Sequence, residues 1–212
     1  MGSLIKRMLI VTAGLFVFSI GVFMIINADL GVAPWDCLSL GIAKHIPYSY
    51  GKVHTVISLI IVLVDVLLKE KIGIGTVLDA LLVGNFVDLI GVFVKIPTDK
   101  PLIASLLLIF GGMFIMAIGQ YFYMRPAMSC GPRDTLLVAI GKRLRKLPIG
   151  LVEVMIQVIV LSIGFALGGP IGIGTVLSVF GIGTAIQIVF TILKFEPRNI
   201  THESIIESVK NI

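Results

Sequence analysis

Gly-Ile-Gly-Thr-Val-Leu stands at residues 73–78 and recurs letter for letter at residues 172–177, 99 residues further along the chain. Other identities recur at this offset, or at an offset of 98, over most of the sequence. They include Gly51 with Gly150, Gly84 with Gly183, Gly14 with Gly112, Gly21 with Gly119, Pro34 with Pro132 and Asp36 with Asp134. Because two nearly equal offsets hold along the chain, we interpret it as an internal duplication, with repeats at about residues 5–97 and 101–195.

The composition indicates the class of protein. Of the 212 residues, 57% are hydrophobic and 14% are charged, and the mean hydropathy is +1.09. A soluble domain is about 45–50% apolar and about 25% charged, and the two cysteines are too few for a disulfide-stapled scaffold. These values exclude a water-soluble domain, a nucleic-acid-binding protein and a disulfide-rich secreted module. They predict an all-α membrane domain over residues 1–195, followed by a short polar tail at residues 196–212.

Six segments are long and apolar enough to cross a bilayer, since a spanning helix needs about 20 mostly apolar residues. They are Met8–Ile26, Val53–Leu68, Gly75–Val94, Leu102–Gln120, Leu151–Leu167 and Thr175–Leu193. Two further apolar segments, Pro34–Ile46 and Pro132–Leu144, would form helices only about 20 Å long, too short for a hydrocarbon core of about 30 Å. Each begins with Pro at the first helical position and has Asp in its first turn, which suits a helix N-terminus. We predict that both are half-helices that enter the membrane from a break in the chain.

The charges indicate the orientation of the chain but not the number of crossings. With six spans and two half-helices, 13 Lys and Arg residues lie on the side of the termini and 4 on the other side. With eight crossings, the count is again 13 to 4. Because cytoplasmic loops carry the excess of basic residues, both termini are predicted to be cytoplasmic. Six spans would give the repeats opposite orientations, as in secondary transporters, whereas the alternative of eight crossings would make them parallel.

Polar side chains inside the apolar segments are the candidate site residues, because burying them in a membrane is costly. Several recur in matched positions of the two repeats: His54 with Glu153, Ser58 with Gln157, Asp79 with Ser178, Asn85 with Thr184 and Asp88 with Gln187. From these and the Pro-x-Asp elements we expect a substrate- or ion-binding site at the interface between the repeats. Its candidate residues are Pro34, Asp36, Pro132, Arg133, Asp134, Asp88, Asn85, His54, Glu153 and Gln157.

The two matched carboxylates admit two interpretations. Asp36 and Asp134 either cap the free N–H groups of their half-helices or contribute to the site, with Asp88 as a further deep carboxylate that holds a proton or a cation. The positive ends of the half-helices would then face an anionic or polar group of the solute. We expect Arg133 to neutralise the neighbouring Asp134, whereas Trp35 offers Asp36 no such partner.

The motifs of enzymes are missing from the sequence. It contains no HExxH, GxSxG, GxxxxGK[ST] or CxxC element. We therefore predict that the protein is not an enzyme and has neither a cofactor nor a metal site.

The segments Gly31–Gly41 and Cys130–Leu136, together with the paired Gly-Ile-Gly-Thr-Val-Leu blocks, resemble the YitT/YczE-type bacterial integral membrane proteins. The resemblance covers about residues 5–195, although the second copy has Ser129 where the first has Gly31. It implies a multi-pass protein of the bacterial cytoplasmic (inner) membrane. The family is largely uncharacterised, and transport is suspected for it.

Small-solute transport or export is the function that the broken segments and matched polar residues favour. The solute would be small and polar or ionic, and the bilayer would be the protein's surroundings. The alternative is a non-transporting scaffold, chaperone or regulator that docks a partner protein on the basic loop at residues 142–146 and on the tail. A homo-oligomer is compatible with either function.

Overall fold

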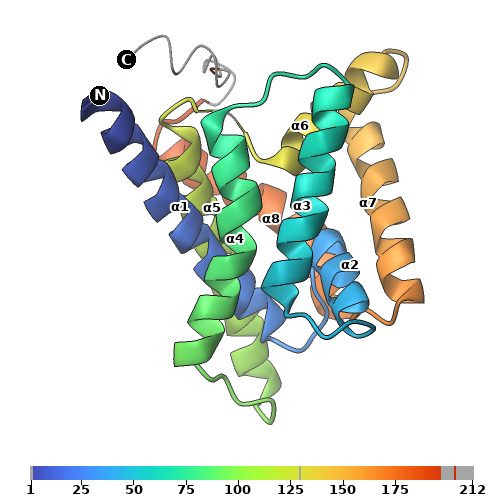
Figure 1. Ribbon diagram of the computed structural model, residues 1–212. Coiled ribbons are helices and arrows are strands. Elements are labelled where there is room, and N and C mark those ends of the chain that lie inside the picture. The colour runs from blue at the N-terminus through green and yellow to red at the C-terminus, as the bar shows by residue number, and fades with distance from the viewer. Residues whose placement is uncertain (1, 129, 197–202, 204–212) are drawn as a thin grey trace.

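The computed structural model of the chain describes residues 2–128, 130–196 and 203, and the description below is of these residues. They form eight α-helices (Figure 1). The helices are α1 (Gly2–Ile26), α2 (Pro34–Ala43), α3 (Tyr50–Leu67), α4 (Ile74–Phe93), α5 (Leu102–Met124), α6 (Pro132–Arg143), α7 (Ile149–Ala166) and α8 (Ile173–Ile192).

Six of these helices are long and apolar enough to cross a membrane, and two are not. The six are α1, α3, α4, α5, α7 and α8. The short helices α2 and α6 have 10 and 12 residues, about half of what a crossing needs. The prediction of six spans and two short helices is therefore confirmed, and the protein is a multi-pass membrane protein. The alternative of eight crossings was wrong, because α2 and α6 are too short to cross.

The helices run between two opposite ends of the molecule, which we name the α6 end (top of Figure 1) and the α2 end (bottom). At the α6 end, the Arg7 guanidinium donates to the Pro126 carbonyl at 2.7 and 3.0 Å. At the α2 end, the Gly174 N–H donates to the Leu30 carbonyl at 2.6 Å. The start of α1 thus lies beside the end of α5, and the end of α1 beside the start of α8. Helices α1, α4 and α7 run towards the α2 end, and α3, α5 and α8 run back (Figure 1).

Helices α1 and α5 form the most extensive helix–helix contact, at the centre of the bundle. Gly14 of α1 lies against Gly119 of α5, and Gly21 lies against Gly112. A Cβ atom on Gly21 would stand 2.5 Å from the Gly112 carbonyl oxygen, so only glycine permits this approach. Small residues allow such close approach in membrane helix pairs.

The remaining helices pack around this pair. Helix α4 packs on α1 and α8 on α5, while α2 packs on α7 and α3 on α6. The order long, short, long, long occurs in both halves of the chain, and these helix pairs correspond to each other under the predicted repeat. The duplication itself stays a prediction.

The contact between α3 and α4 has no equivalent in the second half. In the first half, α3 packs on α4, and Gly51 touches Gly84 so closely that a Cβ atom on either would collide with the other's backbone. The matched glycines of the second half, Gly150 and Gly183, have nothing within 4 Å of the position that a Cβ atom would take. Helices α7 and α8 therefore do not pack on each other where α3 and α4 do.

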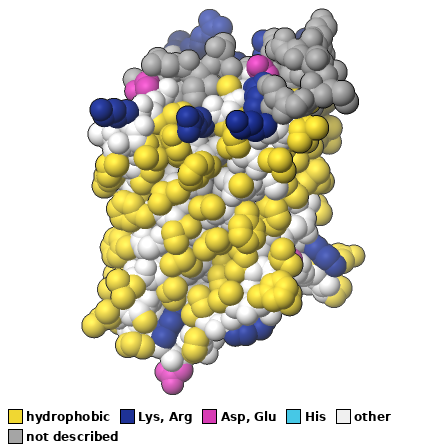
Figure 2. Space-filling model, turned by 90° about the vertical axis from the view of Figure 1, so that its left-hand side faces the viewer, with side chains coloured by type: hydrophobic (Ala, Val, Ile, Leu, Met, Phe, Trp, Pro, Cys, Tyr) yellow, Lys and Arg dark blue, Asp and Glu magenta, His cyan; other side chains and the backbone are white. Residues whose placement is uncertain are grey.

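The outer surface of the bundle is apolar. Figure 2 shows a broad belt of hydrophobic side chains with Lys and Arg side chains gathered towards its two ends. Large exposed side chains such as Phe93, Ile103 and Phe180 belong to spans. In water this surface would be a liability, but in a bilayer it is the surface that contacts the lipid chains.

The glycine contacts predict opposite effects of one substitution at two sites. Gly21→Ala adds a methyl group against the α5 backbone and should lower the free energy of unfolding by about 1–3 kcal/mol, the usual cost of overpacking. Gly183→Ala adds the same group in open space and should be neutral or stabilising, because Ala favours a helix by up to about 1 kcal/mol over Gly. Thermal unfolding in detergent measures both variants. Equal melting temperatures for the two would contradict the packing described.

Candidate functional site

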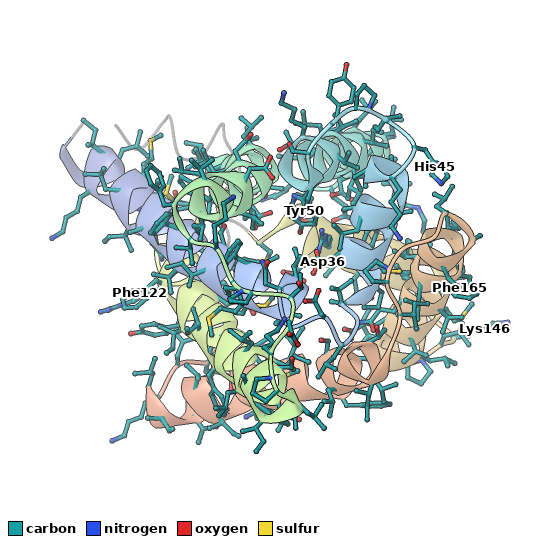
Figure 3. All side chains as sticks on the ribbon, turned by 90° about the horizontal axis from the view of Figure 1, so that it is seen from below. Asp36, His45, Tyr50, Phe122, Lys146 and Phe165 are labelled. Carbon is teal, nitrogen blue, oxygen red and sulfur yellow. The ribbon has the colours of Figure 1, made fainter. Side chains whose placement is uncertain are left out.

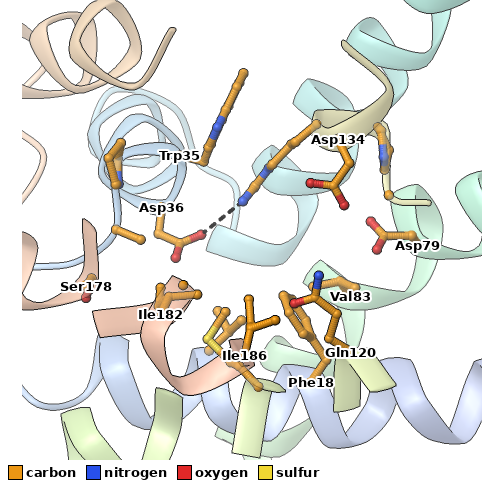
Figure 4. A pocket seen from close by; sticks show the side chains of 18 of the residues that line it. Phe18, Trp35, Asp36, Asp79, Val83, Gln120, Asp134, Ser178, Ile182 and Ile186 are labelled. Carbon is orange, nitrogen blue, oxygen red and sulfur yellow. Dashed lines mark ion pairs between the residues drawn. The ribbon is translucent and has the colours of Figure 1, made fainter. Parts of the chain in front are cut away.

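A cavity of about 260 Å³ lies at the centre of the bundle. Its lining residues come from all eight helices. The short helices α2 and α6 contribute their first turns and the residue before each of them. The charged side chains gather on one side of the cavity, and Phe18, Val83, Ile182 and Ile186 lie on the other together with the amide of Gln120 (Figure 4).

The N-termini of the two short helices meet at this cavity. Pro34 begins α2 and Pro132 begins α6, and both line the cavity. Proline suits this position because it needs no N–H partner there. From the cavity, α2 runs to the α2 end, where the Lys44 ammonium donates to the Gly168 carbonyl at 2.5 Å. Helix α6 runs to the opposite end, where the Arg143 guanidinium donates to the Leu68 carbonyl at 2.8 Å.

Asp36 is the best-connected carboxylate of the site. Its Oδ1 accepts a hydrogen bond of 2.8 Å from the Tyr50 hydroxyl and lies 3.9 Å from a guanidinium nitrogen of Arg133. The guanidinium also lies 5.2 Å from the centre of the Trp35 ring, in a cation–π contact. Burial raises the pKa of Asp36, while the Arg133 charge and the Tyr50 hydrogen bond oppose this shift. Figure 3 places Asp36 and Tyr50 inside the ring of helices, with Phe165 at its outer edge.

Arg133 acts on both aspartates of the short helices. We expected it to neutralise its neighbour Asp134, and its charge does oppose the rise that burial causes in the pKa of Asp134, but the ion pair that it forms is with Asp36 of the other half of the chain. The reason is the meeting of the two helix N-termini, which brings the start of α6 opposite the start of α2. Trp35, expected to leave Asp36 without a partner, instead holds the arginine that pairs with it.

Asp79 of α4 and Asp134 of α6 are the carboxylates that remain free. Figure 4 shows their carboxylate groups facing each other on the cavity wall. Within the described residues, neither carboxylate has a hydrogen bond or an ion pair. Asp134 is exposed and lines both this cavity and a second pocket, which Lys194 also lines. Burial among protein atoms raises the pKa of Asp134 to about 6; the Arg133 charge opposes this shift and the Glu153 charge adds to it.

Neither carboxylate serves as a helix cap. The residues in the N-cap positions are Ala33 and Gly131, which offer no side-chain acceptor. Within the described chain, no backbone N–H donates to the side chain of Asp36 or Asp134. The geometry thus favours a place in the site over the capping interpretation.

Buried polar atoms of three cavity residues, His54, Ser178 and one guanidinium nitrogen of Arg133, have no hydrogen-bond partner in the described structure. His54 is 3% exposed and Ser178 is 1% exposed, and both line the cavity. Neither the Nδ1 atom of His54 nor the Oγ atom of Ser178 has a hydrogen-bond partner in the described structure. Beside them, the Gln157 amide donates to the Glu153 carboxylate at 3.1 Å, on the face of α7 that borders the cavity.

Two of the ten candidate residues lie elsewhere. Asp88 accepts a hydrogen bond of 3.0 Å from the Gly51 N–H, at the contact between α3 and α4. Asn85 donates to the Leu81 carbonyl and to Thr55. Eight candidates therefore line the cavity: Pro34, Asp36, His54, Pro132, Arg133, Asp134, Glu153 and Gln157.

Asp79 is the site carboxylate that the candidate set lacked. It precedes Asp88 by nine residues on α4, and nine residues at 3.6 per turn place two side chains on opposite faces of a helix. Because α3 covers the face of Asp88, Asp79 faces the cavity. Its match with Ser178, which also lines the cavity, was the signal in the sequence that pointed to it.

Comparison with known proteins identifies the family of this chain and several of its relatives. Residues 5–191 match the family described as "Family of unknown function (DUF6198)". The chain belongs to this family. It is 31% identical over 188 residues to an uncharacterised protein of Haemophilus influenzae. The aligned residues make up 89% of this chain and 85% of that protein.

Two further relatives come from Bacillus subtilis. The uncharacterised membrane protein YczE is 26% identical over 178 residues, 83% of this chain and 81% of its own length. The uncharacterised protein YyaS is 30% identical over 169 residues, 78% of this chain and 83% of its own length. The predicted resemblance to YczE-type membrane proteins is confirmed, and no solved structure matches the chain.

The ion pair between the two halves predicts a rescue between two substitutions. Arg133→Met leaves the Asp36 carboxylate buried with the Tyr50 hydroxyl as its remaining partner, and should lower the free energy of unfolding by about 3 kcal/mol, the low end of the cost of breaking a buried ion pair. Adding Asp36→Asn removes the unpaired charge and should restore at least half of this loss. Far-UV circular dichroism during heating measures both. If the losses in free energy of unfolding caused by Arg133→Met and Asp36→Asn simply add in the double variant, the ion pair between the two residues is contradicted.

Proposed function

We propose that the protein carries a small polar or ionic solute across the membrane through the central cavity. The observation that carries the proposal is the polar cavity where the N-termini of α2 and α6 meet, with the free carboxylates of Asp79 and Asp134 on its wall. Polar groups are costly inside a membrane protein and mark solute or ion pathways. Paired broken helices that meet at mid-membrane are typical of the binding sites of secondary transporters.

The distribution of basic residues supports an orientation in which the α6 end is cytoplasmic. The loops at that end hold Lys69, Lys71, Arg125, Arg143, Arg145 and Lys146, and the α2 end holds Lys44, Lys52, Lys95 and Lys100. Cytoplasmic loops carry the excess of Lys and Arg. In this orientation the N-terminus is cytoplasmic, and the predicted cytoplasmic tail follows from the end of α8; its residues 197–202 and 204–212 lie outside the described ones.

The unequal packing of the two halves supports a change of access. The cavity is bordered by Glu153 of α7 and Gly183 of α8, and these helices have no extensive contact with each other. In the first half the matched glycines Gly51 and Gly84 hold α3 and α4 together. We infer that α7 closes onto α8 through Gly150 and Gly183 in a second state, in which the cavity is sealed from the α6 end.

A scaffold or regulator of a partner protein is the competing function. It would use the basic loop at residues 142–146 and the tail as its docking surface. It would need no polar cavity, and no described contact favours it over transport.

Labelling of single cysteines tests the orientation. In a variant without Cys37 and Cys130, Thr98→Cys should react with a membrane-impermeant maleimide in intact cells, because Thr98 lies in the loop at the α2 end. Lys71→Cys, at the α6 end, should react only after the membrane is permeabilised. The reverse pattern would overturn the proposed orientation.

Release of solutes from liposomes tests the transport. The same cysteine-free protein, carrying Gly150→Cys and Gly183→Cys, is reconstituted into liposomes that contain a deproteinised bacterial cytosolic extract, and mass spectrometry follows the medium. The reduced protein should release at least one solute that protein-free liposomes retain. Oxidation should link the two cysteines, whose Cα atoms would approach to about 6 Å in the closed state, and should stop the release reversibly.

A matched pair controls for non-specific oxidation. Gly181 lies on α8 but faces Met113 of α5, so Gly150→Cys with Gly181→Cys should neither link nor lose release on oxidation. Absence of any released solute would overturn the transport proposal in favour of a scaffold. Release that continues when Gly150→Cys and Gly183→Cys are oxidised and unlinked would overturn the closure of α7 onto α8.

A further inference from the structure

We propose that the cavity binds a small organic ammonium cation, with its charged nitrogen between Asp79 and Asp134 and its apolar body against the wall formed by α1 and α8. The proposal names the solute class for the transport function and rests on it in that respect. Binding of the cation to the cavity is measurable without transport.

The charges around the cavity are unbalanced. Four carboxylates line it, those of Asp36, Asp79, Asp134 and Glu153, and Arg133 is the single Lys or Arg side chain among its lining residues. Arg133 pairs with Asp36 through one guanidinium nitrogen at 3.9 Å, and its other terminal nitrogen has no hydrogen-bond partner in the described structure. One guanidinium thus faces four carboxylates, and Asp79 and Asp134 have no described hydrogen bond or ion pair. Uncompensated charges in a protein interior are costly, so a cation in the cavity would offset this cost.

A second observation points to a ligand independently of the acidic residues. The buried Nδ1 of His54 and Oγ of Ser178 have no partner in the described structure, although buried polar atoms almost always have one. They belong to α3 and α8, on different sides of the same cavity. A polar ligand in the cavity, or the water that accompanies it, would supply hydrogen bonds to both.

The composition of the opposite wall indicates an organic cation. Phe18 of α1 with Ile182 and Ile186 of α8 lie across the cavity from the carboxylates (Figure 4). Within the described residues, no three His, Cys, Asp or Glu side chains converge as they would around a metal ion. A ligand with one cationic end and one apolar end therefore fits both walls.

The positive charge that we propose for the ligand is opposite to the charge that the helix dipoles alone would favour. The positive ends of α2 and α6 face the cavity, and we expected them to favour an anionic or polar group. Asp36 and Asp134 stand in the first turns of these helices, so the protein's own carboxylates already occupy the favourable positions for negative charge. An anionic ligand would meet these carboxylates at close range.

Trp35 provides a direct reporter of binding. It is the one tryptophan of the sequence, and its side chain lines the cavity beside Arg133. Purified protein in detergent is titrated with n-butylammonium, and with 1-pentanol and pentanoate as neutral and anionic probes of similar size. The tryptophan emission should change saturably with n-butylammonium and not with the other two.

Substitutions on one helix separate the site from the rest of the protein. Asp79→Asn and Asp134→Asn should each raise the dissociation constant for n-butylammonium by about tenfold or more, the value of a lost charged hydrogen bond. Asp88→Asn is the matched control, because it makes the same change nine residues further along α4, outside the cavity, and keeps an acceptor oxygen for the Gly51 N–H. Its dissociation constant should equal that of the wild type. Melting temperatures verify that all three variants are folded.

Protons should compete with the cation in the unmodified protein, which gives a test that needs no variant. Asp134 faces Arg133 of its own helix, Asp79 of α4, Tyr123 of α5 and Glu153 of α7. Because burial raises the pKa of Asp134 to about 6, its carboxylate is charged above that pH and neutral below it. The alkylammonium stays charged throughout, as a lysine does with its pKa of about 10.4. Binding should therefore weaken as the pH falls through about 6.

The outcomes distinguish this inference from the transport proposal. Saturable binding of n-butylammonium that depends on Asp79 and Asp134 supports the site even if no solute crosses liposomes. Equal or tighter binding of pentanoate, or binding that Asp79→Asn and Asp134→Asn leave unchanged while both fold, overturns the cation site. In that case release of an anionic or neutral solute from liposomes would still support transport.

Discussion

The close approach of α1 and α5 at four glycines is the constraint on which the rest of the structure depends. A bilayer offers no hydrophobic force between helices, so their association relies on close packing. At Gly21 and Gly112 the two backbones touch without a side chain between them. This contact fixes the bundle axis, and α4 and α8 pack on its two sides. The cavity opens beside it, where Phe18 of α1 and Met116 of α5 reach the lining.

The site follows from a second constraint, the shortness of α2 and α6. A helix of 10 or 12 residues cannot reach across the membrane. Both helices therefore begin inside the bundle, where their N-termini need polar surroundings. Within the described residues no backbone N–H donates to Asp36 or Asp134, but both carboxylates stand in the first turns, where the helix dipole favours negative charge. The two helix N-termini thus favour negative charge at the centre of an apolar protein.

Much of this was predictable from local sequence. Apolar runs of about 20 residues define the spans, proline marks the starts of the short helices, and matched positions identify most polar residues of the cavity. Three features were not predictable from local sequence. The choice between Asp79 and Asp88 depends on which face of α4 meets α3, and the pairing of Arg133 with Asp36 depends on how the halves are placed. The glycines Gly150 and Gly183 match Gly51 and Gly84, yet α7 and α8 are apart, because one sequence pattern is compatible with two packing arrangements.

The partners of α2 and α3 have a consequence for biosynthesis. Helix α2 packs on α7 and α3 packs on α6, so the short helix of each half is covered by a helix of the other. When the ribosome has completed α4, the glycine face of α1 and the apolar surface of α2 still lack the helices that cover them. The first half therefore stays incompletely packed in the membrane until α5, α6 and α7 have been inserted. Assembly of the two halves is in this sense a late and concerted event, and a chain that stops midway is a natural substrate for membrane quality control.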